Sequence, residues 1–127
     1  MKQLAFRFGA LYGFLAVLLG AFAAHGLRNR LGGYEIYILK TAAQYMMYHG
    51  LALIALSQIP EALFRVKKIK CATICFLTGV AIFSGSLILL ALTGEKWLGM
   101  VTPIGGLLFL AGWFLFFWVS FSEKKSA

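Results

Sequence analysis

Acidic residues are scarce in this sequence, which contains four glutamates and no aspartate among 127 residues. The glutamates stand apart from one another, in loops, at helix ends or in the C-terminal tail (Glu35, Glu61, Glu95 and Glu123). General acid–base catalysis needs positioned titratable side chains, most often histidines or carboxylates. No paired carboxylates, hydrolase motif or phosphate-binding loop is present, so we expect no catalytic site.

Charged residues of both signs make up only 13% of the chain, whereas a soluble domain contains about 25%. Hydrophobic residues make up 61%, and the mean hydropathy is +0.87. We therefore interpret residues 1–127 as a single membrane domain whose main partner is the lipid bilayer. The net charge of +8 does not indicate nucleic-acid binding, because the basic residues lie between apolar stretches and form no patch with exposed aromatic residues.

Four stretches are long and apolar enough to cross a bilayer, since a spanning helix needs about 20 residues. We expect them at about residues 5–25, 34–58, 71–92 and 103–121. Each is too long and too continuous to be a strand of a membrane barrel. The sequence therefore predicts an all-α fold, an integral membrane four-helix bundle.

Local signals indicate where two of these helices begin and end. Gly94 follows the third segment, and glycine is the usual residue just past a helix end. Thr102 and Pro103 open the fourth segment. Threonine can cap free N–H groups, and proline suits the first helical position. We therefore predict that the fourth helix begins at Pro103, with Thr102 as its cap.

The distribution of lysine and arginine predicts the orientation of the chain. With four spans, both termini and the middle loop share one side of the membrane. That side carries eight basic residues and the other side four (Lys2, Arg7, Arg65, Lys67, Lys68, Lys70, Lys124 and Lys125 against Arg28, Arg30, Lys40 and Lys96). Because basic residues are enriched on the cytoplasmic side, we expect both termini to be cytoplasmic.

The first segment could be a secretory signal, because Ala21-Phe22-Ala23 matches a small-x-small cleavage site. Its apolar run is longer, however, than the roughly 7 to 15 residues of a signal peptide. Small residues also recur along one helical face, at a spacing that lets membrane helices approach closely (Gly9, Gly13, Ala16, Gly20 and Ala24). We expect a retained helix that ends at Gly26 and carries His25 to the outer surface of the bilayer.

Polar side chains form a stripe on one face of the second segment (Thr41, Gln44, Tyr45, Tyr48 and His49). They must turn away from lipid, because an unpaired donor or acceptor there costs several kcal/mol. We expect the stripe to face the glycine-rich face of the first segment. Its residues either form hydrogen bonds that hold the bundle together, which we favour, or form a site for a proton, a quinone or another ligand.

Histidine and cysteine are represented by two residues each. At 1.5 Å per residue, His25 lies about 12 Å from the centre of its helix, whereas His49 lies near the centre of the next. Two axial ligands of one haem need similar depths, so these two do not form a haem site. Two histidines without a nearby carboxylate also fall short of a metal site. Cys71 and Cys75 have a spacing unsuited to a disulfide, and we interpret them as small apolar packing residues.

Glycines in the last two segments are interpreted as notches where helices approach closely. One of them lies in the stretch Phe83-Ser84-Gly85-Ser86. The others lie in the fourth segment (Gly105, Gly106 and Gly112). Together with the small residues of the first segment, they define the helix contacts that we expect.

Three stretches together resemble a known family: LGAFAAHGL from Leu19, TAAQYMMYHGLAL from Thr41, and FSGSL, TPIGG and GW between Phe83 and Trp113. They are similar, in the same order, to the YgdD/YwdK-like family of small bacterial inner-membrane proteins of unknown function. The resemblance covers almost the whole chain, although Met46 stands where the family pattern has glutamine. The resemblance indicates seven residues of this chain that match positions of the family pattern (His25, Tyr45, His49, Thr102, Pro103, Gly105 and Gly106).

This resemblance implies a four-helix integral protein of the bacterial cytoplasmic (inner) membrane, in a family associated with membrane homeostasis. It supplies no established reaction and no cofactor. We predict a non-enzymatic protein with a structural or accessory role in membrane integrity, or a subunit of a larger membrane complex. The alternative is a small transporter or channel that uses the polar face of the second segment. It would need a homo-oligomer, because one bundle of this size has little room for an aqueous path.

Overall fold

The computed structural model describes residues 1–27, 29–64 and 66–121, and these residues are mostly helical. Four long helices are present: α1 (Lys2–Ala21), α2 (Gly33–Ser57), α4 (Lys67–Thr93) and α5 (Leu98–Val119). A π-helical turn, η1 (Phe22–Gly26), extends α1, and a single helical turn, α3 (Glu61–Phe64), lies between α2 and α4. Those three ranges contain no strand, so the predicted all-α class is confirmed.

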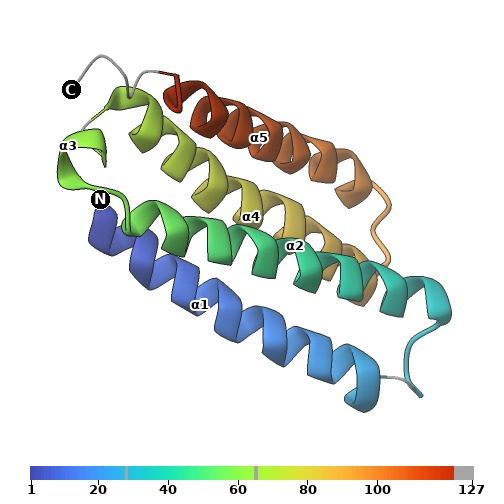
Figure 1. Ribbon diagram of the computed structural model, residues 1–127. Helices are drawn as coiled ribbons and strands as arrows, with labels where there is room; N and C mark the ends of the chain where they lie inside the picture. The colour runs from blue at the N-terminus through green and yellow to red at the C-terminus, as the bar shows by residue number, and fades with distance from the viewer. Residues whose placement is uncertain (28, 65, 122–127) are drawn as a thin grey trace.

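The long helices pack mainly as successive neighbours, α1 on α2, α2 on α4 and α4 on α5. Each runs antiparallel to the one before it (Figure 1). The start of α1, the α3 turn and the end of α5 therefore lie at the same end of the molecule (Figure 1). In this order α2 and α4 are the inner helices, and α1 and α5 are the flanks.

The core lies between the inner helices. The largest apolar side chains that are fully buried come from α2 and α4 (Leu39, Leu53, Leu56, Ile69, Phe76 and Val80). The flanking helices instead expose large apolar side chains, such as Phe14 at 65% and Leu110 at 68%. Soluble proteins rarely leave such continuous apolar faces uncovered, whereas lipid tails solvate them. The outer faces of α1 and α5 are therefore suited to contact with the bilayer.

Three helices in the described ranges are long and apolar enough to cross a membrane: Lys2–Gly26, which is α1 with η1, and then α4 and α5. Helix α2 has sufficient length, since 25 residues measure about 37 Å against a hydrocarbon core of about 30 Å. Its polar stripe and terminal charges lower its mean hydropathy. The difference from the four predicted spans thus concerns α2 alone.

The start of α5 corrects the sequence prediction. The helix begins at Leu98, so Pro103 lies inside it and Thr102 does not cap it. Thr102 Oγ1 instead lies 2.5 Å from Ser86 Oγ on α4 and 3.3 Å from the Leu98 carbonyl oxygen. The prediction was wrong because the proline was interpreted as a helix start, although one helical turn precedes it. The predicted end of the third helix is confirmed, because Gly94 follows α4 with φ of 74°.

Close helix approach depends on a few glycines. A Cβ on Gly9 would lie 2.7 Å from the Gly50 carbonyl oxygen, which fixes the contact of α1 with α2. A Cβ on Gly105 would lie 2.8 Å from the Cα of Phe83, at the contact of α5 with α4. Gly79 and Gly112 are equally crowded by aromatic rings across the same interface. Gly9, Gly105 and Gly112, for which a packing role was predicted, lie at these close contacts, as do Gly50 and Gly79, which were not predicted.

Other predicted packing glycines leave room for a Cβ atom. A Cβ on Gly13 would have Met47 Sδ as its nearest neighbour, at 4.0 Å. A Cβ on Gly20, Gly85 or Gly106 would meet no atom within 4 Å. Two helices that cross at an angle touch closely over a short length. A stripe of small residues therefore gives the face of contact but not the point of contact.

Candidate functional site

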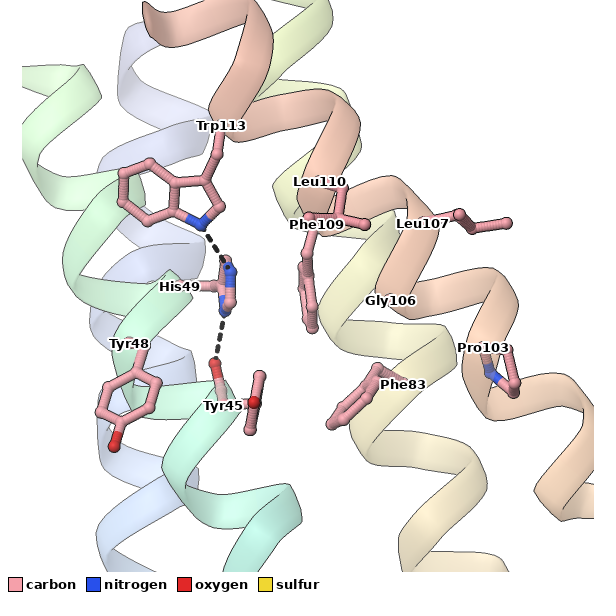
Figure 2. Close-up of a pocket in the computed structure, with 10 residues that line it drawn as sticks. All are labelled: Tyr45, Tyr48, His49, Phe83, Pro103, Gly106, Leu107, Phe109, Leu110 and Trp113. Atoms are coloured by element: carbon pink, nitrogen blue, oxygen red, sulfur yellow. Dashed lines mark hydrogen bonds between the residues drawn. The ribbon is translucent and has the colours of Figure 1, made fainter.

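An apolar groove lies between α2 and α5, with α4 forming its floor (Figure 2). Its volume is about 770 Å³. The groove exists because α4 separates α2 from α5, so that their facing sides do not close on each other. None of the lining residues carries a formal charge (Tyr45, Tyr48, His49, Phe83, Pro103, Gly106, Leu107, Phe109, Leu110 and Trp113).

His49 lies at one end of the groove and connects α2 to α5. Its side chain is buried, with 3% exposed. The Trp113 indole N–H donates to His49 Nε2 at 3.0 Å, and His49 Nδ1 lies 2.8 Å from the Tyr45 carbonyl oxygen (Figure 2). An indole nitrogen can only donate, so Nε2 accepts and Nδ1 carries the proton. The imidazole is therefore neutral, and both of its nitrogens are hydrogen-bonded within the protein.

Aromatic rings surround this imidazole. The Phe109 ring is stacked on it, with centroids 3.6 Å apart and an interplanar angle of 8°. Phe76 approaches from the floor at 5.3 Å, and Tyr45 lies one turn earlier on α2 at 6.2 Å. The Tyr45 ring also contacts Phe83 at 4.8 Å. These contacts hold the imidazole ring in one orientation, which keeps its hydrogen bonds aligned.

The polar stripe of α2 does not face α1, which corrects the sequence prediction. The face of α2 that contacts α1 is formed around Gly50, and His49 points instead toward α4 and α5. Of the five stripe residues only His49 is buried, whereas Gln44, Tyr45 and Tyr48 are exposed. Thr41 is partly exposed and donates to the Tyr37 carbonyl oxygen of its own helix. Helical periodicity groups these residues on one side but does not say which neighbour that side meets.

His25 is not part of this groove. It is exposed on η1, beyond the end of α1. The π-helical geometry is visible in the bond from the Leu27 N–H to the Phe22 carbonyl oxygen at 2.8 Å. Within the described ranges, no three or more histidine, cysteine or acidic side chains gather as ligands for a metal ion. The structure therefore separates the two histidines, one exposed and one buried.

The decisive partners of His49 were not identified as such from the sequence. Trp113 and Phe109 lie four residues apart on α5, so they share one face of that helix. A signal was available, because a tryptophan in the middle of an apolar segment needs an acceptor for its N–H group. The sequence offers few polar partners at that depth, and His49 is one of them.

Further polar contacts join the helices. Ser84 is buried on α4 and donates to the Ala42 carbonyl oxygen of α2 at 2.8 Å. Tyr12 of α1 donates to the Leu77 carbonyl oxygen of α4 at 2.8 Å. Each inner helix is thus linked to a neighbour by a hydroxyl group. These bonds replace the water contacts that the bilayer does not provide.

Comparison with known proteins places this chain in a family. Residues 19–106 match the family described as "Protein of unknown function (DUF423)". The chain belongs to the DUF423 family. That match includes the α2 and α4 residues of the groove and ends at Gly106, three residues before Phe109.

Curated relatives of this DUF423 chain are named as membrane proteins. The UPF0382 membrane protein of Haemophilus influenzae (strain Rd) is 39% identical over 125 residues, covering 98% of this chain and 99% of the relative. The UPF0382 membrane protein YwdK of Bacillus subtilis (strain 168) is 36% identical over 107 residues, covering 84% and 87%. The UPF0382 inner membrane protein YgdD of Escherichia coli (strain K12) is 37% identical over 108 residues, covering 85% and 82%.

These matches confirm the family resemblance that the three sequence motifs indicate. No solved structure shows a significant match to this chain. The names of the relatives, together with the three long apolar helices, identify this DUF423 chain as an integral membrane protein. The names of these relatives state no reaction, ligand or partner.

Proposed function

We propose that this chain is a non-catalytic integral protein of the bacterial cytoplasmic membrane with a structural or accessory role. The observation that supports this most directly is the burial and hydrogen bonding of His49. It is the buried histidine of the described chain, and both of its ring nitrogens are engaged by Tyr45 and Trp113. A general base or a proton carrier needs a free lone pair, and this imidazole has none.

The rest of the described interior agrees with this proposal. In the described ranges, no buried side-chain nitrogen or oxygen atom lacks a hydrogen-bond partner. The three described glutamates (Glu35, Glu61 and Glu95) are not buried. The buried side chains of His49, Ser84 and Ser86 join helices, at about 0.6 to 1.7 kcal/mol per bond. This use of polar groups favours packing over chemistry.

The proposed topology has four crossing helices and cytoplasmic termini. Helix α2 is long enough to cross the bilayer and packs between α1 and α4, two of the helices that have the length and hydropathy of spans. The end that holds the start of α1 carries five described basic residues and the other end three (Lys2, Arg7, Lys67, Lys68 and Lys70 against Arg30, Lys40 and Lys96). The positive-inside rule then assigns the first end to the cytoplasm. Arg28, Arg65, Glu123, Lys124 and Lys125, which also enter the sequence predictions, lie outside the described residues.

Cysteine labelling tests this topology. Cys71 is exposed near the start of α4, so an impermeant maleimide should label it only after the cytoplasmic membrane is permeabilised. The control is K96C in a C71A background, because Lys96 is exposed at the opposite end and should be labelled in intact spheroplasts. Labelling of Cys71 in intact spheroplasts would contradict the proposed orientation.

The structural role is tested against transport with His49→Ala. We expect proteoliposomes of the unchanged protein to show no proton or ion flux above empty liposomes. His49→Ala should lower the thermal midpoint in detergent, because it removes the link from α2 to α5. Tyr48→Ala is the control, since Tyr48 lies on the same helix face and is 54% exposed. Flux that disappears in His49→Ala would overturn the proposal and favour an oligomeric transporter or channel.

An accessory role also predicts a partner. Purification under mild solubilisation, followed by size measurement, should recover the chain either as a homo-oligomer or with other membrane proteins. A monomer without any partner would contradict the accessory role and support a structural role of the single chain in the bilayer. All three results differ in measured mass, so one sedimentation experiment separates them.

A further inference from the structure

The groove between α2 and α5 is centred on the middle of the membrane. Trp97 directly precedes α5 and Trp118 lies in its last turn. They are 21 residues apart, which corresponds to about 30 Å, the thickness of the hydrocarbon core. Interfacial tryptophans mark the two boundaries of that core. The groove extends along α5 from Pro103 to Trp113, so its midpoint lies within one residue of the midpoint between the two tryptophans. Its occupant must therefore reside at the bilayer midplane.

The volume of the groove is too small to hold a whole helix with its side chains. Pro103 and Trp113 are ten residues apart, which corresponds to a length of about 15 Å. A volume of about 770 Å³ over about 15 Å gives a mean cross-section of about 50 Å². An α-helix with its side chains is at least about 10 Å wide, which corresponds to about 80 Å². The groove accommodates a narrower molecule, and its volume lies within the usual range for ligand sites of about 300 to 1,000 Å³.

The lining indicates a neutral ligand that carries a hydrogen-bond acceptor. No lysine or arginine lines the groove, so it offers no partner for a phosphate group. Tyr45 lies at the midpoint of α2 and is 37% exposed, and its hydroxyl group forms no hydrogen bond to any described residue. A hydroxyl group without a partner at this depth is costly, so it favours an acceptor on the ligand. The ester groups of phospholipids lie near the membrane surface and do not reach it.

We propose that this groove binds a neutral isoprenoid lipid with a carbonyl-bearing head group, the chemical class of the isoprenoid quinones. The Tyr45 hydroxyl donates to a carbonyl oxygen of the head group. The branched chain lies against Leu107, Leu110 and the open wall at Gly106, where a Cβ would meet no atom within 4 Å. This site goes beyond the proposed structural role and depends only on α5 crossing the membrane.

Trp113 is a direct reporter for this site, because it lines the groove and quinones quench tryptophan fluorescence. In a background of Trp97→Phe and Trp118→Phe, Trp113 is the only tryptophan left among the three of the chain. Delipidated protein in detergent is titrated with a naphthoquinone that carries an isoprenoid side chain. We expect saturable quenching at one ligand per chain.

Two variants and a matched control test the assignment. Gly106→Leu fills the groove and should abolish saturable quenching, whereas Gly85→Leu should not change it, because a Cβ on Gly85 also meets no atom within 4 Å but Gly85 does not line the groove. Tyr45→Phe should weaken binding by about three- to fifteen-fold, which corresponds to one hydrogen bond in lipid. Far-UV circular dichroism confirms folding, and the pair Gly106→Ala and Gly85→Ala replaces the leucine pair if Gly106→Leu does not fold.

Three results would overturn the assignment. The first is linear quenching that is identical in Gly106→Leu and Gly85→Leu. The second is saturable quenching that Tyr45→Phe leaves unchanged. The third is native mass spectrometry that shows a phospholipid, or a second copy of the chain, retained in the unchanged protein and lost in Gly106→Leu. Flux and topology measurements do not enter this test, so failure of this proposal and failure of the structural role are distinguishable.

Discussion

Replacing Trp113 by phenylalanine removes the N–H group that donates to His49 and keeps an aromatic ring in its place. The bond measures 3.0 Å, and the imidazole that accepts it is 97% buried by area, since 3% is exposed. Trp113 itself is 45% exposed. In a bilayer, lipid tails replace lost side-chain contacts at little cost, so the hydrogen bond dominates the effect. We therefore expect Trp113→Phe to destabilise the protein by about 0.6 to 1.7 kcal/mol.

A double-mutant cycle isolates this bond. His49→Phe and Trp113→Phe each leave one polar group without its partner, whereas the double variant leaves neither. The double variant should therefore lose less stability than the sum of the single variants, with a coupling energy of about 0.6 to 1.7 kcal/mol. The assay is reversible unfolding by sodium dodecyl sulfate in mixed micelles, followed by far-UV circular dichroism. Trp118→Phe is the control for the same exchange on the same helix, and a coupling energy of zero would refute the assigned bond.

Four further substitutions test individual contacts. Gly105→Ala should destabilise by about 1 to 3 kcal/mol, because its Cβ would lie 2.5 Å from the Phe83 backbone nitrogen, whereas Gly85→Ala should be neutral or stabilising by up to about 1 kcal/mol. The difference in unfolding midpoint between Gly105→Ala and Gly85→Ala measures the cost of placing a Cβ at the close contact of Gly105. Ser84→Ala should cost about 0.6 to 1.7 kcal/mol in the same assay, and a neutral result would remove the bond between α4 and α2. Glu61→Gln should not change the midpoint, because its ion pair with Lys2 is long, at 3.7 Å, and exposed.

The long helices could be predicted from the sequence because lipid solvation needs long apolar runs, which are visible without any tertiary information. Helix ends were predictable where one residue type has a single conformational role. Gly94 has a positive φ, which favours glycine, and it ends α4 as expected. Pro103 has two compatible positions, at a helix start or one turn inside the helix, and the sequence does not distinguish them.

The candidate site could be predicted only in part. The polar stripe of α2 made His49 conspicuous, because ionisable residues inside a membrane are rare. Its partner depended on the packing order of the helices, which periodicity does not contain. The groove itself results from α4 lying between α2 and α5, and residues such as Gly106 and Leu107 line it without any polar signal in the sequence.

The order in which the helices pack is also the order in which the ribosome makes them. Helices α1 and α2 meet first, α4 then docks on α2, and α5 docks last on α4. At a synthesis rate of about 5 to 20 residues per second, each helix has seconds to find its partner before the next one emerges. A nascent chain that ends after α2 therefore already contains both residues of the close contact between Gly9 and Gly50. The groove, in contrast, exists only in the completed chain, because six of its lining residues come from the last helix.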